Sequence, residues 1–259
     1  DITDSNQVTS IVDITGASGI DLYPPLNPTV ALVTSTNDGW VRKVDLGSNS
    51  VIEMIQFTES LYRGIVLAGN GTPTSTPAES QQPDGTGTSA SFHNPYGIAI
   101  HPTENYAVVA DSGNHRIRKI ELATGDVTTL AGSGYKYWTE TATGTSAHFN
   151  APYDIAIDPS GTYALIADYS NKRVRHIVLA TKLVTTLAGD GTSGLRNGSG
   201  TSARFGFFTG IDIDPSGNYA LVADTTNHCI RKIVLATGEH GTYKDVTTLA
   251  GDGTPGLTD

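Results

Sequence analysis

The sequence predicts an all-β protein: a β-propeller made of four-stranded antiparallel blades, about four of which are visible. Three segments are close copies of one another, Phe92 to Gly132, Phe149 to Gly189 and Phe205 to Gly251, and Gly19 to Gly69 is a degenerate fourth copy. Each copy contains short apolar stretches separated by turn residues and shows no helical periodicity. Repeats of this kind stack into one body, so a length of 259 residues does not imply separate globular domains.

Each copy begins with a predicted strand in which isoleucines alternate with small or polar residues, as at Ile98 and Ile100. A turn of the form Asp-Pro-Ser-Gly follows, with His101 in the place of the aspartate in the second blade. Proline fixes φ and glycine permits a positive φ, so the chain reverses there. The second strand is apolar on both faces, which is typical of a strand buried between sheets. We expect it at 106–110, 163–167 and 219–223.

A polar turn leads to the third strand, and the fourth carries the sequence Val-Thr-Thr-Leu-Ala-Gly. The third strand is expected at 116–122, 173–179 and 229–235. In the degenerate first copy, 19–24, 31–33 and 41–46 match the first three strands. Its fourth strand falls within Val51–Phe57 or within Ile65–Gly69.

The spacing from Phe92 to Phe149 is 57 residues, more than the roughly 40–50 residues of a compact blade. The excess lies in Gly/Thr/Ser-rich connectors, which we expect to be exposed loops on one rim. The predicted division is an N-terminal strand resembling an outer blade strand (1–18), blade 1 (19–69), a Thr/Ser/Pro/Gly-rich connector (70–91), blade 2 (92–132), a connector (133–148), blade 3 (149–189), a connector (190–204), blade 4 (205–251) and the start of a further connector (252–259).

The sequence from Ala110 to Arg118, ADSGNHRIR, resembles the NHL repeat, a family of β-propeller blades. Asn171-Lys-Arg-Val and Asn227-His-Cys-Ile are variants of its Asn-His-Arg-Ile core, and the resemblance spans roughly Gly19 to Gly251. The resemblance implies the propeller fold and leaves the function open, because similar propellers bind proteins, RNA or sugars and a few are enzymes.

Three aspartates occupy one position of the repeat, and an arginine follows each of them seven residues later. These repeat positions are Asp111, Asp168 and Asp224, with Arg118, Arg175 and Arg231. A functional interpretation makes them an ion-binding ring. Because a site normally breaks the symmetry of a repeat, we expect a structural role instead, in which each aspartate accepts backbone N–H bonds and pairs with its arginine.

No catalytic, cofactor or metal site is predicted. The histidines lack HxH or HxxxH spacing and fall at different places in the blades; they are His93, His101, His115, His148, His176, His228 and His240. A propeller lyase that resembles NHL proteins uses histidine-bound zinc, but its ligands cannot be mapped onto this chain. The loops at Asp190 and Asp252 offer few of the six to eight oxygens that calcium needs. Cys229 replaces a repeated arginine, and no base is placed to activate it.

The formal net charge of −10 disfavours nucleic acid and anionic membrane surfaces as partners. No apolar run approaches 18 residues, so no membrane insertion is expected. Asn70 and Asn197 begin N-glycosylation sequons, and a Ser/Thr/Pro tract follows the first of them. The predicted O-glycosylation sites in that tract are Thr72, Thr74, Ser75 and Thr76. These features predict an extracellular or cell-surface protein.

Gln7 to Val12 resembles a fourth strand, and the last residues copy the start of a connector. Three explanations remain open. The chain is a fragment of a larger array, or this strand closes a ring within blade 4, or it completes a sheet in a neighbouring molecule and builds a head-to-tail filament.

The predicted function is therefore that of a non-catalytic extracellular structural or protein-interaction unit, glycosylated and assembling head-to-tail into a filament. Its expected partners are other proteins or copies of itself, and no cofactor is expected. One alternative is a carbohydrate-binding lectin: Tyr96 and Tyr153 recur at one rim position, although Thr209 breaks the series. The other alternative is a metal-dependent propeller lyase or hydrolase.

Overall fold

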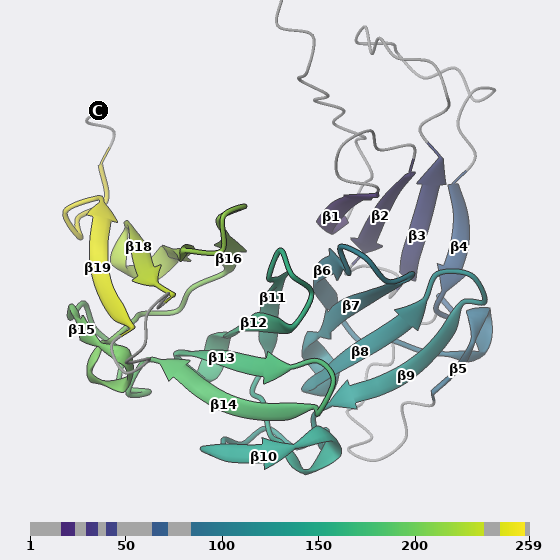
Figure 1. Cartoon of the computed structure of the whole chain (residues 1–259), viewed down its shortest axis with the longest axis horizontal. Helices are drawn as coiled ribbons and strands as arrows, with labels where there is room; N and C mark the ends of the chain where they lie inside the picture. The colour runs from purple at the N-terminus through teal and green to yellow at the C-terminus, as the bar shows by residue number, and fades with distance from the viewer. Residues whose placement is uncertain are drawn as a thin grey trace, which may run out of the picture.

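The computed structural model describes residues 17–23, 30–35, 40–45, 64–71, 84–235 and 244–256. In these residues it contains β-strands and short 3-10 turns and no α-helix. The strands form four antiparallel sheets that follow one another around an open arc (Figure 1). The prediction of an all-β propeller is confirmed. Within the same residues, no helix is long and apolar enough to cross a membrane.

Every blade is a meander in which consecutive strands pair. Blade 1 contains β1 (Ala17–Tyr23), β2 (Val30–Ser35), β3 (Trp40–Asp45) and β4 (Gly64–Ala68). Blade 2 contains β6 (Pro95–Ile100), β7 (Tyr106–Asp111), β8 (Arg116–Glu121) and β9 (Asp126–Ala131). Blade 3 contains β11 (Pro152–Ile157), β12 (Tyr163–Asp168), β13 (Arg173–Val178) and β14 (Leu183–Ala188). Blade 4 contains β16 (Gly210–Ile213), β17 (Tyr219–Asp224), β18 (Cys229–Val234) and β19 (Asp245–Ala250). The fourth strand of blade 1 lies at the second of its two predicted places.

Blades 2 to 4 differ from the predicted four-stranded unit by a short fifth strand at the outer edge. These strands are β5 (Gly85–Thr86), β10 (Thr141–Thr143) and β15 (Gly198–Ser199). Each comes from the connector that precedes its blade and pairs with the outermost strand, β9, β14 or β19. Two or three residues are too few to show the alternation of a strand, so these strands could not be predicted from the sequence. The connectors are therefore not simply exposed loops.

After each short strand the connector enters a segment of the form Gly-Thr-Ser-Ala-x-Phe, which we call the anchor segment; it occupies residues 87–92, 144–149 and 200–205. Its first three residues form a 3-10 turn, and its phenylalanine is fully buried in all three copies. Phe149 belongs to the hydrophobic cluster that joins blades 2 and 3, and Phe205 to the one that joins blades 3 and 4. Each anchor phenylalanine thus packs against the blade before its own.

Backbone hydrogen bonds hold each anchor segment to that preceding blade. Gly132 donates its N–H to the carbonyl of Gly144 at 3.1 Å, and Ser133 donates to Ala147 at 2.9 Å. At the next junction Gly189 donates to Gly200 at 3.2 Å, and the N–H of Asp190 to the carbonyl of Ala203 at 3.0 Å. The junctions therefore repeat in both apolar and polar contacts.

The innermost strands β1, β6, β11 and β16 lie next to one another in this order towards the centre of the arc (Figure 1). The backbones approach so closely that a Cβ on Gly97 of β6 would lie 2.6 Å from the Cα of Asp154 in β11. A glycine is required at that point because the neighbouring backbone has no room to move away.

Candidate functional site

The repeated Asp–Arg pairs form one buried cluster in each of blades 2 to 4. Asp111 accepts hydrogen bonds from Asn114 Nδ2 at 2.9 Å and from Arg118 Nη1 at 3.0 Å, and both side chains of the ion pair are fully buried. Its other oxygen accepts the backbone N–H of His93 at 2.8 Å. The counterparts Asp168–Arg175 and Asp224–Arg231 have the same partners, with ion pairs of 3.3 and 3.0 Å.

These clusters position the anchor phenylalanines. The aspartate binds the N–H of the residue after the phenylalanine, and the arginine donates to the carbonyl of the residue before it, as Arg118 does to Ser91 at 3.2 Å. The guanidinium carbon also lies 5.5 Å from the ring centroid of Phe92. The other two blades repeat both contacts. Because each carboxylate is occupied within its own blade, the clusters do not offer a ring of free ligands.

The aspartates of the two glycine-rich loops, Asp190 and Asp252, also form hydrogen bonds or ion pairs with residues nearby in the chain. Asp190 pairs with Arg196 at 3.1 Å and with Arg204 at 2.7 Å, and Asp252 accepts the N–H of Thr254 at 2.9 Å. Among the residues that the structure describes, no three His, Cys, Asp or Glu side chains are grouped in a way that could hold a metal ion. His240 lies outside the described residues.

The rim tyrosines of the sequence analysis belong to a longer aromatic ladder. Tyr96 and Tyr153 stack with their ring centroids 4.0 Å apart, and Tyr153 stacks on Tyr169 at 4.5 Å. Phe207 extends the ladder at 4.9 Å from Tyr169, and the ammonium of Lys172 lies 4.5 Å from its ring. A hydrogen bond to Tyr96, together with burial, raises the pKa of Tyr153 to about 12. Since the tyrosine faces cover one another, they are not free to stack on a sugar ring.

Asp154 breaks the symmetry of the innermost strands, because Gly97 and Gly210 occupy its place in the neighbouring blades. Its carboxylate accepts the N–H of Ile155 and, across to blade 4, that of Ile211, both at 2.9 Å. Burial raises the pKa of Asp154 to about 6, although both hydrogen bonds oppose the shift. The departure from glycine was visible in the sequence, but the contact with blade 4 was not.

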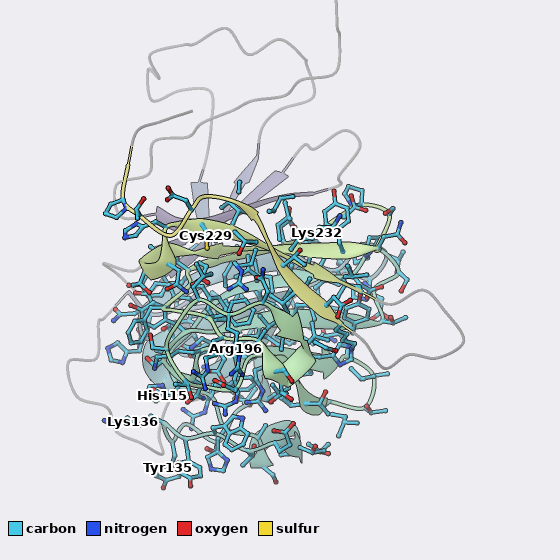
Figure 2. The ribbon with its side chains drawn as sticks, turned by 90° about the vertical axis from the view of Figure 1, so that its left-hand side faces the viewer. His115, Tyr135, Lys136, Arg196, Cys229 and Lys232 are labelled. Carbon is cyan, nitrogen blue, oxygen red and sulfur yellow. The ribbon has the colours of Figure 1, made fainter. Side chains whose placement is uncertain are left out.

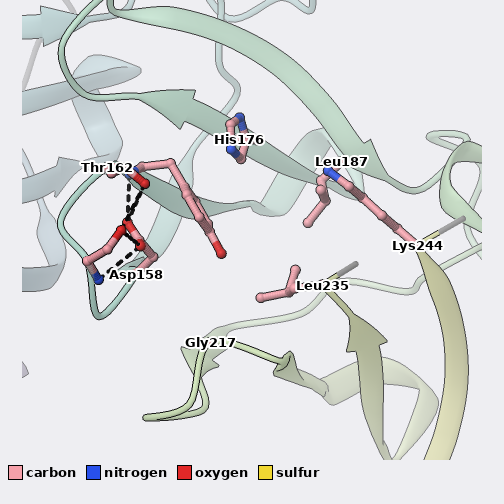
Figure 3. Close-up of a pocket in the computed structure, with 9 residues that line it drawn as sticks. Asp158, Thr162, His176, Leu187, Gly217, Leu235 and Lys244 are labelled. Carbon is pink, nitrogen blue, oxygen red and sulfur yellow. Dashed lines mark hydrogen bonds between the residues drawn. The ribbon is translucent and has the colours of Figure 1, made fainter. Parts of the chain in front are cut away.

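A cavity of about 300 Å³ lies between blades 3 and 4, at the ends of the strands where the Asp-Pro-Ser-Gly turns sit (Figure 3). It is lined by polar side chains of blade 3, by two leucines and by Gly217 and Lys244 of blade 4. The polar lining residues of blade 3 are Asp158, Ser160, Thr162, Tyr163 and His176.

The two junctions differ at the turn beside this cavity. At the junction of blades 2 and 3, the buried ring of His101 crosses to blade 3, where its Nε2 lies 2.9 Å from the carbonyl oxygen of Gly161. Asp158 occupies the same place in blade 3 but folds back into its own turn, where it accepts the N–H of Ser160 at 3.0 Å and of Tyr163 at 2.7 Å. At this position, therefore, the side chain crosses the first junction and stays within its own turn at the second.

In this cavity Lys244 offers a charge partner for an anion, and the carboxylate of Asp158 is the second charged group of the lining. Burial and the charge of Lys244 lower the pKa of His176 to about 4, so the imidazole is uncharged at neutral pH. Burial also lowers the pKa of Lys244, and no carboxylate of a described residue forms an ion pair with it. The carboxylate of Asp158 accepts the hydroxyls of Ser160 and Thr162 as well as backbone N–H groups of its own turn. This leaves the ammonium of Lys244, the imidazole of His176 and the hydroxyl of Tyr163 for a ligand.

The predicted N-glycosylation positions are both exposed, Asn70 after β4 and Asn197 beside β15. The side-chain carbonyl of Asn197 accepts hydrogen bonds from Arg231 at 2.9 Å and from Thr248 at 3.2 Å, so the amide nitrogen that takes a glycan is not consumed by these contacts. The predicted O-glycosylation sites Thr72, Thr74, Ser75 and Thr76, and the N-terminal strand at 7–13, lie outside the described residues.

The chain is similar to known repeat proteins, although no family model matches it. It is 34% identical over 104 residues to NHL repeat-containing protein 2 of Homo sapiens, which is 40% of this chain and 14% of that protein. It is 30% identical over 158 residues to the chloroplastic protein SUPPRESSOR OF QUENCHING 1 of Arabidopsis thaliana, which is 60% of this chain and 15% of that protein. The chain thus spans about a seventh of these relatives' lengths. The predicted NHL-type repeat is confirmed.

Solved structures share the fold at low sequence identity. An auxiliary nutrient binding protein from Bacteroides thetaiotaomicron is 20% identical, with a TM-score of 0.58 over 90% of this chain and 48% of that one. Kuenenia stuttgartiensis hydrazine synthase is 12% identical, with a TM-score of 0.54 over 96% of this chain and 53% of that one. The second of these is an enzyme, so the shared fold does not assign an activity.

Proposed function

Since this chain is built from NHL-type β-propeller blades, we propose that it serves as a non-catalytic structural and protein-interaction unit, located outside the cell or at its surface. One observation carries the proposal: the face of blade 4 that points away from blade 3 is apolar, and no described residue covers it. Leu249 on β19 is 56% exposed and Ile230 on β18 is 37% exposed, the kind of surface that marks an interaction site.

The distribution of charge supports the same proposal. The ion pairs in which both side chains are fully buried, the three Asp–Arg pairs, hold the anchor phenylalanines. They are parts of the scaffold, whereas the apolar face has no intramolecular role in the part of the chain that is described. The partners that fit such a surface are other proteins or copies of this chain, and head-to-tail assembly into a filament is the extended form of the proposal.

Glycosylation is the second part of the proposal. Asn70 and Asn197 are exposed and lie at the ends of blades, so glycans attached to them would point away from the core. The expected modification is one N-linked glycan at each, with O-linked sugars on the tract at 72–76.

Intact mass and light scattering on protein secreted by a eukaryotic host test these two parts together. The expected results are a mass above that of the 27.1 kDa chain, which falls after glycosidase treatment, and a particle larger than a monomer. Asn70→Gln and Asn197→Gln each remove one glycan. Asn27, whose sequon is blocked by Pro28, is the internal control and stays unmodified. A glycan-free monomer contradicts the proposal.

The cavity between blades 3 and 4 favours a second candidate function, the binding of a carbohydrate that carries an acidic group. The hydroxyl of Tyr163 and the imidazole of His176 suit a polyol, and Lys244 supplies a cation for a carboxylate or sulfate. Isothermal titration with glucuronate, glucose and inorganic phosphate distinguishes the binding of an acidic sugar from the binding of any sugar or of any anion. We expect glucuronate to bind, glucose to bind at least tenfold more weakly, and Lys244→Gln to abolish binding. The control Lys232→Gln, on a lysine that packs over Tyr219, leaves binding unchanged.

A further inference from the structure

The outward face of blade 4 has the same design as two faces that are covered. In blade 2, Ile117, Leu130 and Ala131 pack against Phe149. In blade 3, Val174, Leu187 and Ala188 take their places and pack against Phe205. The repeat puts Ile230, Leu249 and Ala250 at the same positions of blade 4.

The three faces differ in whether an anchor phenylalanine is present. Leu130 and Leu187 are 5% and 4% exposed, whereas Leu249 is 56% exposed. Beside Ile230 and Ala250 lies an apolar depression of about 250 Å³, whose wall also includes Cys229 and Gly251. An apolar cavity of about 150 Å³ already accommodates benzene, so the depression has room for a phenyl ring. Figure 2 shows this side of the molecule, with Cys229 and Lys232 on β18.

The backbone donors next to the depression match the covered junctions as well. Gly189 and Asp190 donate their N–H groups to the anchor segment of blade 4. Gly251 and Asp252 hold the same positions one blade further on, and no described residue accepts a bond from them. Blade 4 therefore presents the complete receiving side of a junction. This side consists of the apolar depression, which we call the socket, and two backbone donors.

We infer that the outward face of blade 4 is the docking site for a further propeller blade, which inserts the phenylalanine of a Gly-Thr-Ser-Ala-x-Phe segment beside Ile230 and Leu249. The glycine and alanine carbonyls of that segment accept the N–H groups of Gly251 and Asp252. This inference rests on the proposed function, because it names the partner for the surface that carries it.

Of the two kinds of partner that the proposed function allows for this face, another protein and a copy of this chain, we choose the first: the occupant is a further blade and not an unaltered second copy of this chain. All three anchor phenylalanines of the chain are fully buried, and an Asp–Arg pair holds each of them in its own junction. A second copy would have to break one of its junctions to release an anchor. A blade that brings its own anchor segment has no such cost.

One residue of the face adds selectivity. Asp212 on β16 stands where Ala99 and Ala156 face the next blade, and it is exposed. A docking blade therefore meets a carboxylate at the innermost strand and needs an N–H group or a cation opposite it. The model for such a contact is Asp154, which accepts the N–H of Ile211 from the neighbouring blade.

Cys229 provides a specific test, because it is the only cysteine of the chain and lines the socket. The probe is a synthetic peptide with the sequence of residues 199–208, SGTSARFGFF, added to the full chain. We expect the peptide to slow alkylation of Cys229 by iodoacetamide about tenfold at a concentration ten times its Kd. The control peptide carries alanine in the place of Phe205 and gives no protection.

Two variants of the chain locate the effect on the face. Leu249→Glu places a charge on the apolar face, at the position next to Ala250 of the socket, and is expected to remove the protection. Val234→Glu, on an exposed residue of β18 whose counterpart in blade 2 is Glu121, is expected to leave it unchanged. Equal alkylation rates with both peptides, or full protection in Leu249→Glu, overturn the inference.

Light scattering on the same variants separates this inference from the proposed function. Self-association that Leu249→Glu abolishes would put a second copy on the face and overturn the choice of occupant, while the interaction function stands. A monomer that binds the peptide would support the docking of a blade and contradict self-assembly.

Discussion

The junction between blades 2 and 3 and the junction between blades 3 and 4 share the same anchoring contacts, and a cavity of about 300 Å³ lies at the second. Both have a buried anchor phenylalanine and the same pair of backbone hydrogen bonds. They differ at a turn, where His101 crosses the first junction and Asp158 turns away from the second. The repeated residues close both junctions, and the position of His101 and Asp158 is a place outside the shared pattern at which the two junctions differ.

The largest effect is expected where the junctions are alike. Phe149→Ala and Phe205→Ala each remove a fully buried ring and should lower the free energy of unfolding by about 3–5 kcal/mol. Urea denaturation measures both. Costs that agree within about 1 kcal/mol support equivalent junctions, since equal side chains are removed from equal surroundings. A negligible cost at either junction would show that its anchor does not hold the blades together.

The next effect concerns Asp154, which only the second junction uses. Its pKa of about 6 in the folded protein lies above the ordinary value of 3.8, so the folded state binds the proton more tightly. The contribution of Asp154 to stability is therefore present below pH 4 and is lost as the pH rises to 6. Relative to Asp154→Asn, the wild type should lose up to about 3 kcal/mol of unfolding free energy over this range. Parallel pH profiles for the two proteins contradict the burial of this carboxyl group.

Exchange of the two turn residues should exchange the two junctions. His101→Asp removes a buried imidazole and its contact with Gly161, which should cost about 1–3 kcal/mol and open a cavity between blades 2 and 3. Asp158→His should fill the existing cavity and abolish the binding of acidic sugars. Calorimetric titration and a crystal structure of each variant check the exchange. Retained binding in Asp158→His would move the ligand site elsewhere.

The smallest effect is expected on the uncovered face. Leu249→Ala should change the free energy of unfolding by no more than about 0.5 kcal/mol, because the side chain is mostly exposed. The matched variant is Leu187→Ala, which removes the buried counterpart in blade 3 and should cost about 2–5 kcal/mol. Similar costs for the two leucines would indicate that the face of blade 4 is covered in solution.

The blade architecture was predictable because its signals recur in frame. The alternation at Ile98 and Ile100, the Asp-Pro-Ser-Gly turns and the Val-Thr-Thr-Leu-Ala-Gly strands each mark one element in every copy. The short fifth strands were not predictable, because a two-residue strand such as Gly85–Thr86 forms only through its pairing with β9. Tertiary pairing, and not local propensity, creates such strands.

The candidate sites were only partly visible in the sequence. The sequence shows that Asp158 stands at the repeat position of His101. It does not show the direction that each side chain takes at its junction. Tyr169 stacks on Tyr153 from a different turn, so no regular spacing along the chain predicts that it belongs to the aromatic ladder. Cys229 looked like an isolated thiol, and only its place in the socket makes it a useful probe.

Blade 4 presents an empty copy of the face that is filled in blade 3, and amide hydrogen exchange at two pairs of positions can show this. Gly189 and Asp190 donate to an anchor segment, and Gly251 and Asp252 are their counterparts. In the isolated chain, Gly251 and Asp252 should exchange much faster than Gly189 and Asp190, and the SGTSARFGFF peptide should slow only the faster pair. Equal protection of both pairs without a partner, or no change when the peptide is present, would contradict the account.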